Sequence, residues 1–234
     1  LVQRFGAAGA RLTVPSRRPA RAKPLITLPT VEVVGADVHD DAQLARMVAG
    51  RDAVINLVAI LHGSPAEFER AHVALPQRLA QACTAAGVRR LLHVSALGVA
   101  DDAPSHYLRS KARGEAVLRA AGLDLTLLRP SVIFGAGDRF LNVFAQLQAL
   151  LPVVPLAGAD ARFQPVWVED VAAALVRMLD DDTTIGRTFE AAGPRVLTLA
   201  ELVRLAGRWS GHERPVLPLP DALARAQAAL MALA

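Results

Sequence analysis

Tyr107 and Lys111 are the residues whose types and spacing are best suited to chemistry in this chain. Tyr107 is the only tyrosine, and Lys111 is one of two lysines in the 234 residues. Residues four apart share a helical face, so the phenol and the ammonium would converge on one site. A nearby cation favours the phenolate and would draw the tyrosine pKa from about 10 toward the range of a general acid/base. The structural alternative is an aromatic side chain packed on the core beside a solvated lysine.

The surrounding residues predict the helix that must position this pair. Residues 107–121 are rich in Ala, Leu, Arg and Glu, with Ser105 before them and Gly122 after them. Apolar strand-like runs alternate with helix-like segments, which predicts an α/β fold with a doubly wound parallel sheet. The predicted strands are residues 11–15, 31–36, 52–60, 88–95 and 124–130, and the predicted helices are residues 40–49, 65–86 and 105–121.

Beyond Pro130 the alternation changes, which predicts a second, smaller lobe. We expect one domain over residues 1–135 and a small C-terminal substrate lobe over residues 136–234, interwoven with the first. The lobe's predicted helices are residues 140–150, 170–179 and 198–210, and its extended segments are residues 163–168, 188–191 and 214–219.

Both ends of the sequence resemble interrupted helices. Residues 1–8 match the end of an amphipathic helix that stops near Gly9, and residues 221–234 have a helical composition without a capping signal. We therefore expect a piece of a longer protein, one that begins after a first strand and its turn. Residues 222–234 are expected to pack on the core, the alternative being a contact with a membrane surface or a partner.

The composition argues against several classes of function. Arginine accounts for 24 of the 26 basic residues, and acidic residues are interspersed among them, so the net charge of +4 does not indicate nucleic-acid binding. The six histidines lack paired metal-ligand spacing, so no metal is expected. The single cysteine, Cys83, indicates a small buried apolar group in a reducing compartment. No apolar run is long enough for a transmembrane segment.

Ligands of parallel α/β sheets bind beyond the carboxyl ends of the strands, which directs attention to the residues there. Ser16, Arg17 and Arg18 follow the first predicted strand. Because arginine offers a planar fork to phosphate, these residues are predicted to hold an adenosine 2′-phosphate. The alternative is a surface loop in an arginine-rich chain.

The ends of the next strands complete this prediction. Asp37 and Val38 would receive an adenine ring, although Asp37 could equally be a turn residue. The later strand ends carry residues that would let a cofactor's ribose pass close by: Leu57, Val58 and Ala59, then Ser95 and Ala96.

Together these features resemble the short-chain dehydrogenase/reductase superfamily, in its extended or atypical branch of NAD-dependent epimerase/dehydratase type. The resemblance covers almost the whole chain. It rests on residues 107–111 (YLRSK), 129–135 (RPSVIFG) and 165–171 (PVWVEDV). Residues 139–142 (RFLN) and 93–95 (HVS) further resemble the nucleotide-binding accessory subunit of respiratory complex I and its bacterial relatives.

The resemblance implies a Rossmann-like fold, a nicotinamide cofactor and roles for individual residues. Tyr107 would be the proton donor or acceptor, and Lys111 would hold the nicotinamide ribose and lower the tyrosine pKa. Pro130 and Ser131 would line the nicotinamide pocket. The cofactor implied by Arg17 and Arg18 is NADP(H), with NAD(H) as the alternative.

Two departures from this family leave catalysis open. The glycine-rich turn that cradles a pyrophosphate is absent, because Gly6 and Gly9 precede the first predicted strand and fit a helix end better. Active members also place a Ser or Thr near the end of the fourth strand predicted here, where this chain has Ser95 followed by Ala96. Ala96 falls where active members have this hydroxyl, and the absence of the hydroxyl would cost a developing oxyanion of order 3 kcal/mol of stabilisation.

Two classes of function therefore remain. The first is an NADP(H)-binding protein that serves as an accessory or assembly partner of a membrane enzyme such as complex I. The second is an active reductase or epimerase that uses Tyr107, Lys111 and Ser95 on a small carbonyl or nucleotide-sugar substrate. A degraded fold that binds no nucleotide is a third alternative. The predicted location is the cytoplasm, including the periphery of a membrane.

Overall fold

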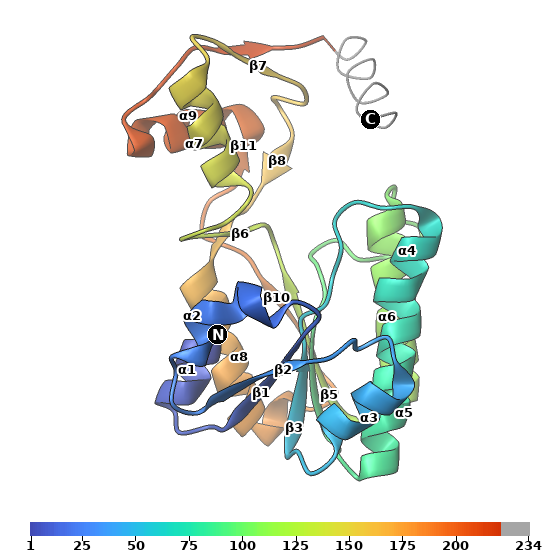
Figure 1. Cartoon of the computed structure of the whole chain (residues 1–234). Coiled ribbons are helices and arrows are strands. Elements are labelled where there is room, and N and C mark those ends of the chain that lie inside the picture. Colours follow the sequence, from blue (N-terminus) through green and yellow to red (C-terminus); the bar gives the residue numbers. More distant parts are fainter. Residues whose placement is uncertain (221–234) are drawn as a thin grey trace. The chain divides into compact units, whose positions relative to one another are not determined.

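Parallel strands covered by helices form the first of two units in the computed structural model, which describes residues 1–220 (Figure 1). This unit contains Leu1–Pro130 and Glu169–Ala191. The second unit contains Ser131–Val168 and, within the described residues, residues 192–220. The helix expected over residues 221–234 lies outside the described residues.

The first unit has a four-stranded parallel sheet in the order β10 (Thr188–Ala191), β5 (Asp124–Pro130), β4 (Arg90–Val94) and β3 (Ala53–Asn56). A separate parallel pair joins β1 (Leu12–Ser16) to β2 (Val31–Gly35). Leucines on β4 and β5 are almost fully buried on both faces of the sheet, as expected for strands covered by helices. The predicted doubly wound α/β fold is confirmed.

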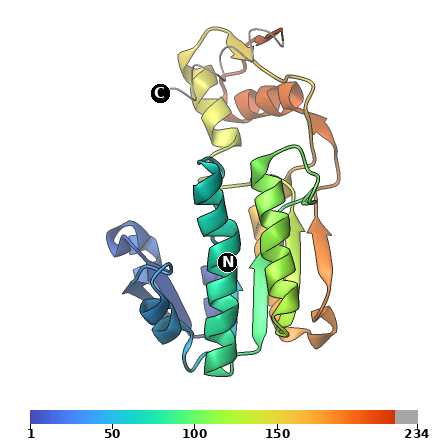
Figure 2. The same cartoon turned by 90° about the vertical axis from the view of Figure 1, so that its right-hand side faces the viewer.

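Helices cover both faces of this sheet (Figures 1 and 2). One layer holds α3 (Asp41–Val48), α5 (Leu75–Ala86) and α6 (His106–Ala120), and Figure 2 shows α5 beside α6. The other holds α8 (Val168–Asp180), which an ion pair between Glu169 and Arg4 joins to α1 (Val2–Ala7). After α1 comes Gly9 with a φ of +84°, so the predicted helix end is confirmed. The short helix α2 (Lys23–Ile26) was not predicted.

Capping residues place these helices as the sequence indicated. Asp40 accepts a hydrogen bond from Gln43 N at the start of α3, and Ser105 accepts one from Leu108 N at the start of α6. At the end of α5, Gly87 takes a left-handed conformation with a φ of +72°. Cys83 is fully buried among apolar side chains, as predicted, and burial raises the pKa of its thiol to about 11.

Two of the predicted elements were wrong in extent. The strand expected over residues 52–60 ends at Asn56, because the Asn56 side chain accepts a hydrogen bond from Val58 N and turns the chain out of the sheet. The helix expected over residues 65–86 is divided into α4 (Pro65–Glu69), a π-helical turn (Arg70–Ala74) and α5. Pro76 explains the division, because it has no N–H to donate to the carbonyl of His72 four residues earlier.

The second unit packs α7 (Leu141–Leu150) on α9 (Leu199–Ser210), and α9 begins after its N-cap Thr198, where the predicted helix starts. Its extended segments pair in twos. The pairs are β6 (Ile133–Phe134) with β9 (Val166–Trp167), β7 (Val154–Leu156) with β12 (Val216–Pro218), and β8 (Arg162–Phe163) with β11 (Leu197–Thr198). Apolar side chains of α7 and α9 form most of its core.

Candidate functional site

Helix α6 carries Tyr107 and Lys111 on the face that packs against the rest of the first unit. Lys111 is only 1% exposed, and its Nζ donates a hydrogen bond of 2.9 Å to the carbonyl of Val94 at the end of β4. The Tyr107 ring is partly buried and meets the ring of His72 edge-on at 5.4 Å. The lysine is therefore not the solvated side chain of the structural alternative, and its ammonium lies at the carboxyl end of the sheet.

Burial sets the protonation of both groups. It lowers the pKa of Lys111 from 10.5 to about 8, against the opposing influence of Glu115. It raises the pKa of Tyr107 above its ordinary value, so the phenol stays protonated at neutral pH. The predicted lowering of the tyrosine pKa is wrong in this structure, because desolvation of the ring outweighs any effect of the nearby ammonium.

Polar side chains at the ends of β3 and β4 form a second part of the site. Asn56 uses its Oδ1 to accept from Val58 N, so its amide Nδ2 donates to Nδ1 of His93 at 3.1 Å. His93 must then carry its proton on Nε2, and burial lowers its pKa to about 3. Both His93 Nε2 and the Oγ of Ser95 are buried without a hydrogen-bond partner in the part of the chain that the structure describes.

Unpaired buried polar atoms are costly, so these atoms indicate a place where a polar ligand would bind. Ser95 directly follows β4, and its backbone N–H donates to the carbonyl of Leu128 at 2.7 Å. Ala96 follows Ser95 and has no hydroxyl to offer. A nicotinamide cofactor fits the chemistry present here: a hydroxyl without a partner and a buried ammonium beside the end of a parallel strand.

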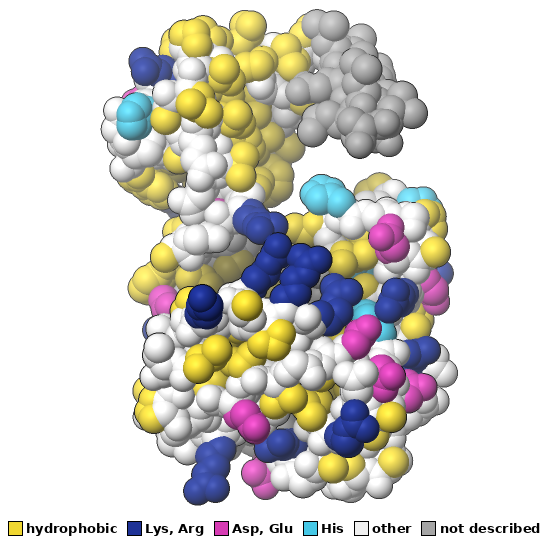
Figure 3. Space-filling view, viewed as in Figure 1, with side chains coloured by type: hydrophobic (Ala, Val, Ile, Leu, Met, Phe, Trp, Pro, Cys, Tyr) yellow, Lys and Arg dark blue, Asp and Glu magenta, His cyan; other side chains and the backbone are white. Residues whose placement is uncertain are grey.

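The basic residues after β1 form a pocket of about 430 Å³ lined by Ser16, Arg17, Arg18 and Arg21. Figure 3 shows Lys and Arg side chains gathered in a row on this side of the molecule. Ser16 is used locally, because its Oγ accepts a hydrogen bond from Arg18 N at 3.2 Å. Arg21 was not singled out from the sequence. It joins the pocket through the short helical turn Pro19–Ala22, which places it one turn after Arg18.

The remaining predicted residues lie in loops at the same end of the strands. Asp37 accepts from His39 N at 3.0 Å, and its own N–H donates to Gln43, so its carboxylate shapes a turn. Val38 packs against the core. Leu57 and Val58 lie in the exposed loop after β3, with Leu57 50% exposed, and Ala59 follows them.

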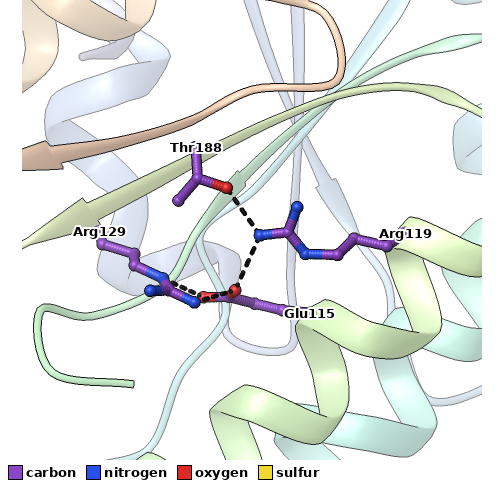
Figure 4. A network of polar contacts seen from close by, with 4 residues as sticks. All are labelled: Glu115, Arg119, Arg129 and Thr188. Atoms are coloured by element: carbon purple, nitrogen blue, oxygen red, sulfur yellow. Dashed lines mark hydrogen bonds and ion pairs between the residues drawn. The ribbon is translucent and has the colours of Figure 1, made fainter. Parts of the chain in front are cut away.

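Sequence reasoning missed a polar network that holds α6 against β5 and β10. Glu115, one turn after Lys111, accepts two hydrogen bonds from Arg129 at 2.9 and 2.7 Å (Figure 4). Arg119 contacts the same carboxylate and donates to Thr188 on β10. Arg129 directly precedes Pro130, whose carbonyl accepts from Leu97 N. Pro130 is buried at the end of β5, and Ser131 is the first residue of the second unit.

Residues 1–220 contain no group of three or more His, Cys, Asp or Glu side chains placed to hold a metal ion. No helix in that range is both long and apolar enough to cross a bilayer.

Comparison with known proteins places the site in context. A family model described as NAD(P)H-binding matches residues 1–182. Subunit 9 of the NADH dehydrogenase (ubiquinone) 1 alpha subcomplex from Arabidopsis thaliana mitochondria is 33% identical over 98% of this chain. The ceramide reductase of Caulobacter vibrioides is 32% identical over 82% of this chain. This chain spans 59% of the length of the first relative and 60% of the second.

Solved structures share the fold at low sequence identity. A double mutant of the dTDP-glucose 4,6-dehydratase DesIV from Streptomyces venezuelae, with NAD and DAU bound, has a TM-score of 0.81 and 23% identity. The match covers 94% of this chain and 80% of that one. MoeE5 in complex with UDP-glucose and NAD has a TM-score of 0.79 and 21% identity, over 93% of this chain and 80% of that one.

Proposed function

Because this chain belongs to the NAD(P)H-binding family, we propose that it is an NADP(H)-binding protein of the atypical short-chain dehydrogenase/reductase type, in which the cofactor is held more than it is turned over. The observation that carries the proposal is Lys111, a buried lysine whose Nζ is directed to the end of β4 by Val94. One of its three N–H groups goes to that carbonyl. The other two are suited to the hydroxyls of a nicotinamide ribose.

The residues around Lys111 favour binding over catalysis. Ala96 cannot stabilise an oxyanion, and donors of that kind are worth several kcal/mol in acyl and carbonyl chemistry. The Tyr107 phenol, protonated at neutral pH, would serve as a second hydrogen-bond donor to the ribose. Pro130 and Ser131, at the end of β5, would line the nicotinamide side. The relative named as a subunit of NADH dehydrogenase supports a role as an accessory or assembly partner of respiratory complex I, at the periphery of a membrane.

The preference for NADP(H) over NAD(H) rests on the arginine pocket after β1. Arg17, Arg18 and Arg21 supply up to three guanidinium groups in a space larger than one phosphate needs. Charge-assisted hydrogen bonds from arginine to phosphate are short and strong, and an acidic residue that would select a free ribose hydroxyl is missing from this pocket lining. The adenine would lie by Asp37 and Val38, with Leu57, Val58 and Ala59 beside the ribose.

A second candidate function, an active NADP-dependent reductase or epimerase, is favoured by Ser95. Its buried Oγ has no partner among residues 1–220, so it could receive a substrate oxygen in place of the missing hydroxyl at position 96. A bound nicotinamide would supply hydride. Tyr107 would then give its proton to the substrate oxygen while Lys111 holds the ribose. The similarity to a protein named ceramide reductase supports this alternative.

Loss of NADPH absorbance in the presence of small ketones and nucleotide sugars separates the two candidates. We expect no consumption above background with the full-length protein that contains this chain. The reductase would be established instead if the wild type consumed NADPH and the Tyr107→Phe variant did not, while that variant kept its affinity for NADPH. The accessory role has its own test: deletion of the gene should lower the amount of assembled complex I on native gels, and unchanged assembly would refute it.

A further inference from the structure

We infer that His72 is a positioning residue that fastens the loop after β3 to the helix carrying Tyr107 and Lys111. This inference rests on the proposed cofactor binding, because that loop, Leu57 to Ile60, is the segment proposed to pass the cofactor ribose. His72 lies in the π-helical turn between α4 and α5 and is 2% exposed. It is one of the largest fully buried side chains, and neither candidate function uses it.

Both nitrogens of the His72 ring are engaged, each with a different element. Nε2 accepts a hydrogen bond of 3.1 Å from the backbone N–H of Ile60 in the loop. Nδ1 lies 2.8 Å from the Oγ of Ser110, the residue before Lys111. The ring therefore spans the space between the loop and α6 and is the direct polar connection between them.

The hydrogen bonds around Ser110 determine where the histidine proton lies. The Ser110 hydroxyl donates to the carbonyl of Tyr107 at 2.8 Å, so its hydrogen is already committed. The contact between Nδ1 and Oγ then requires the proton to be on Nδ1, which leaves Nε2 free to accept from Ile60. One tautomer satisfies the whole chain from Ile60 to Tyr107. Burial, and then the Lys111 charge, lower the pKa of His72 to about 4, which keeps this ring neutral.

The backbone around His72 is shaped to deliver the ring to this position. Pro76 cannot donate to the His72 carbonyl, and the π-helical turn that results is a feature frequent at functional sites. The freed carbonyl lies directly against Gly114 of α6, where an added Cβ would come within 1.9 Å of the oxygen. Helix α6 therefore approaches the π-helical turn at backbone distance.

The loop is fixed at two points by this arrangement. Asn56 holds Val58 N at 3.0 Å, and His72 holds Ile60 N at 3.1 Å. These hydrogen bonds fix only the backbone, and the side chains of Leu57 and Val58 stay exposed and available to a ligand. A pre-positioned loop lowers the entropy cost of binding, so releasing Ile60 should weaken cofactor binding.

Three substitutions separate this role from simple core packing. His72→Gln keeps an acceptor near the Nε2 position for Ile60, whereas His72→Asn keeps only a donor near the Nδ1 position for Ser110. His72→Leu removes both. We expect the Ile60 amide to exchange with solvent about five- to ten-fold faster in His72→Leu and His72→Asn, the effect of one lost hydrogen bond, and near the wild-type rate in His72→Gln. NADPH dissociation constants should follow the same order.

Three further measurements complete the experiment: amide exchange in β4, for comparison with Ile60; NADPH binding; and the nitrogen chemical shifts of His72, which report the position of its proton. Gln77→Ala, at an exposed position, is the matched control. Unchanged Ile60 exchange in all variants, an equal acceleration at Ile60 and in β4, or a wild-type His72 protonated on Nε2 would each overturn the inference. The Gln and Asn variants decide it if His72→Leu does not fold. A wild-type protein that binds no NADPH refutes the proposed function alone, because Ile60 exchange still reports the connection.

Discussion

Arg129 binds the carboxylate of Glu115 through two parallel hydrogen bonds, from Nε to Oε1 and from Nη2 to Oε2 (Figure 4). The Glu115 side chain is only 3% exposed. The pair joins the helix that carries Lys111 to the strand that ends at Pro130, so two parts of the proposed cofactor site depend on one ion pair. The negative charge of Glu115 also moderates the lowering of the Lys111 pKa.

The first prediction concerns this pair. Glu115→Ala should lower the free energy of unfolding by about 3 kcal/mol, because it leaves the Arg129 guanidinium partly buried without its partner. Glu69→Ala removes an ion pair of the same 2.7 Å length, but between half-exposed side chains, and should cost less than about 1 kcal/mol. Urea unfolding of the two variants measures the difference. Equal losses would show that burial of the Glu115 pair contributes nothing.

The second prediction concerns the close approach of α6 to the π-helical turn. Gly114→Ala should destabilise the protein by at least about 2 kcal/mol, although alanine favours helices, because its Cβ would collide with the His72 carbonyl. The adjacent, exposed Arg113→Ala should change the free energy of unfolding by less than about 1 kcal/mol. A stabilised Gly114→Ala variant would contradict the observed helix packing.

The third prediction concerns pH. The folded pKa of Lys111, about 8, lies below its ordinary value of 10.5. Below pH 8 Lys111 is charged in both states, so the full cost of burying its charge lowers the free energy of unfolding. Between pH 8 and 10.5 the lysine is protonated in the unfolded chain but neutral in the folded protein, so the free energy of unfolding rises with pH. Lys111→Met should abolish this rise. Lys23→Met, at the chain's other and exposed lysine, should keep it.

Urea unfolding at pH 7 and pH 9.5 tests the pH prediction. Burial raises the pKa values of Tyr107 and Cys83, so these two groups lower the free energy of unfolding as the pH rises. Both are present in all three proteins, so their contributions cancel in the comparison. If the wild type and Lys111→Met depend on pH in the same way, Lys111 does not titrate as its burial indicates.

The fourth prediction concerns cofactor choice. The full-length protein should bind NADPH at least about ten-fold more tightly than NADH, because charge-assisted bonds to the 2′-phosphate are worth about 1.5–3 kcal/mol. Arg17→Ala with Arg18→Ala should erase the preference and leave NADH affinity nearly unchanged. The exposed pair Arg204→Ala with Arg208→Ala removes the same charge elsewhere and should leave the preference intact. If the Arg17 and Arg18 variant keeps its preference, these arginines do not contact the phosphate.

Local sequence signals predicted most of the fold. Capping residues such as Asp40, Ser105 and Thr198 set helix starts that the structure reproduces, and the apolar runs gave the central strands. These signals act within one turn or one strand, so they can be read without knowing the tertiary structure. The same locality explains why Tyr107 and Lys111 could be placed on one helix.

The missed features depend on contacts between distant residues or on a local rule that was not applied. The role of His72 can be recognised only once α6 is known to lie against the turn between α4 and α5. His72 and Ser110, whose side chains are in contact there, are 38 residues apart in the sequence. Glu115 and Arg129 meet only because the chain reverses direction after α6 and β5 then runs alongside that helix. Pro76, inside a predicted helix, was a signal that could have revealed the π-helical turn. Burial, which raises the Tyr107 pKa, also emerges only from the packed structure.

Calorimetric titration of NADPH into the full-length wild-type protein and its Lys111→Met variant tests the central claim most directly. The account predicts micromolar or tighter binding by the wild type, about −8 kcal/mol, and a loss of at least about ten-fold in Lys111→Met, with Tyr107→Phe remaining within about three-fold of the wild type. Equal affinity in the wild type and in a folded Lys111→Met variant would contradict the claim that this buried lysine holds the cofactor.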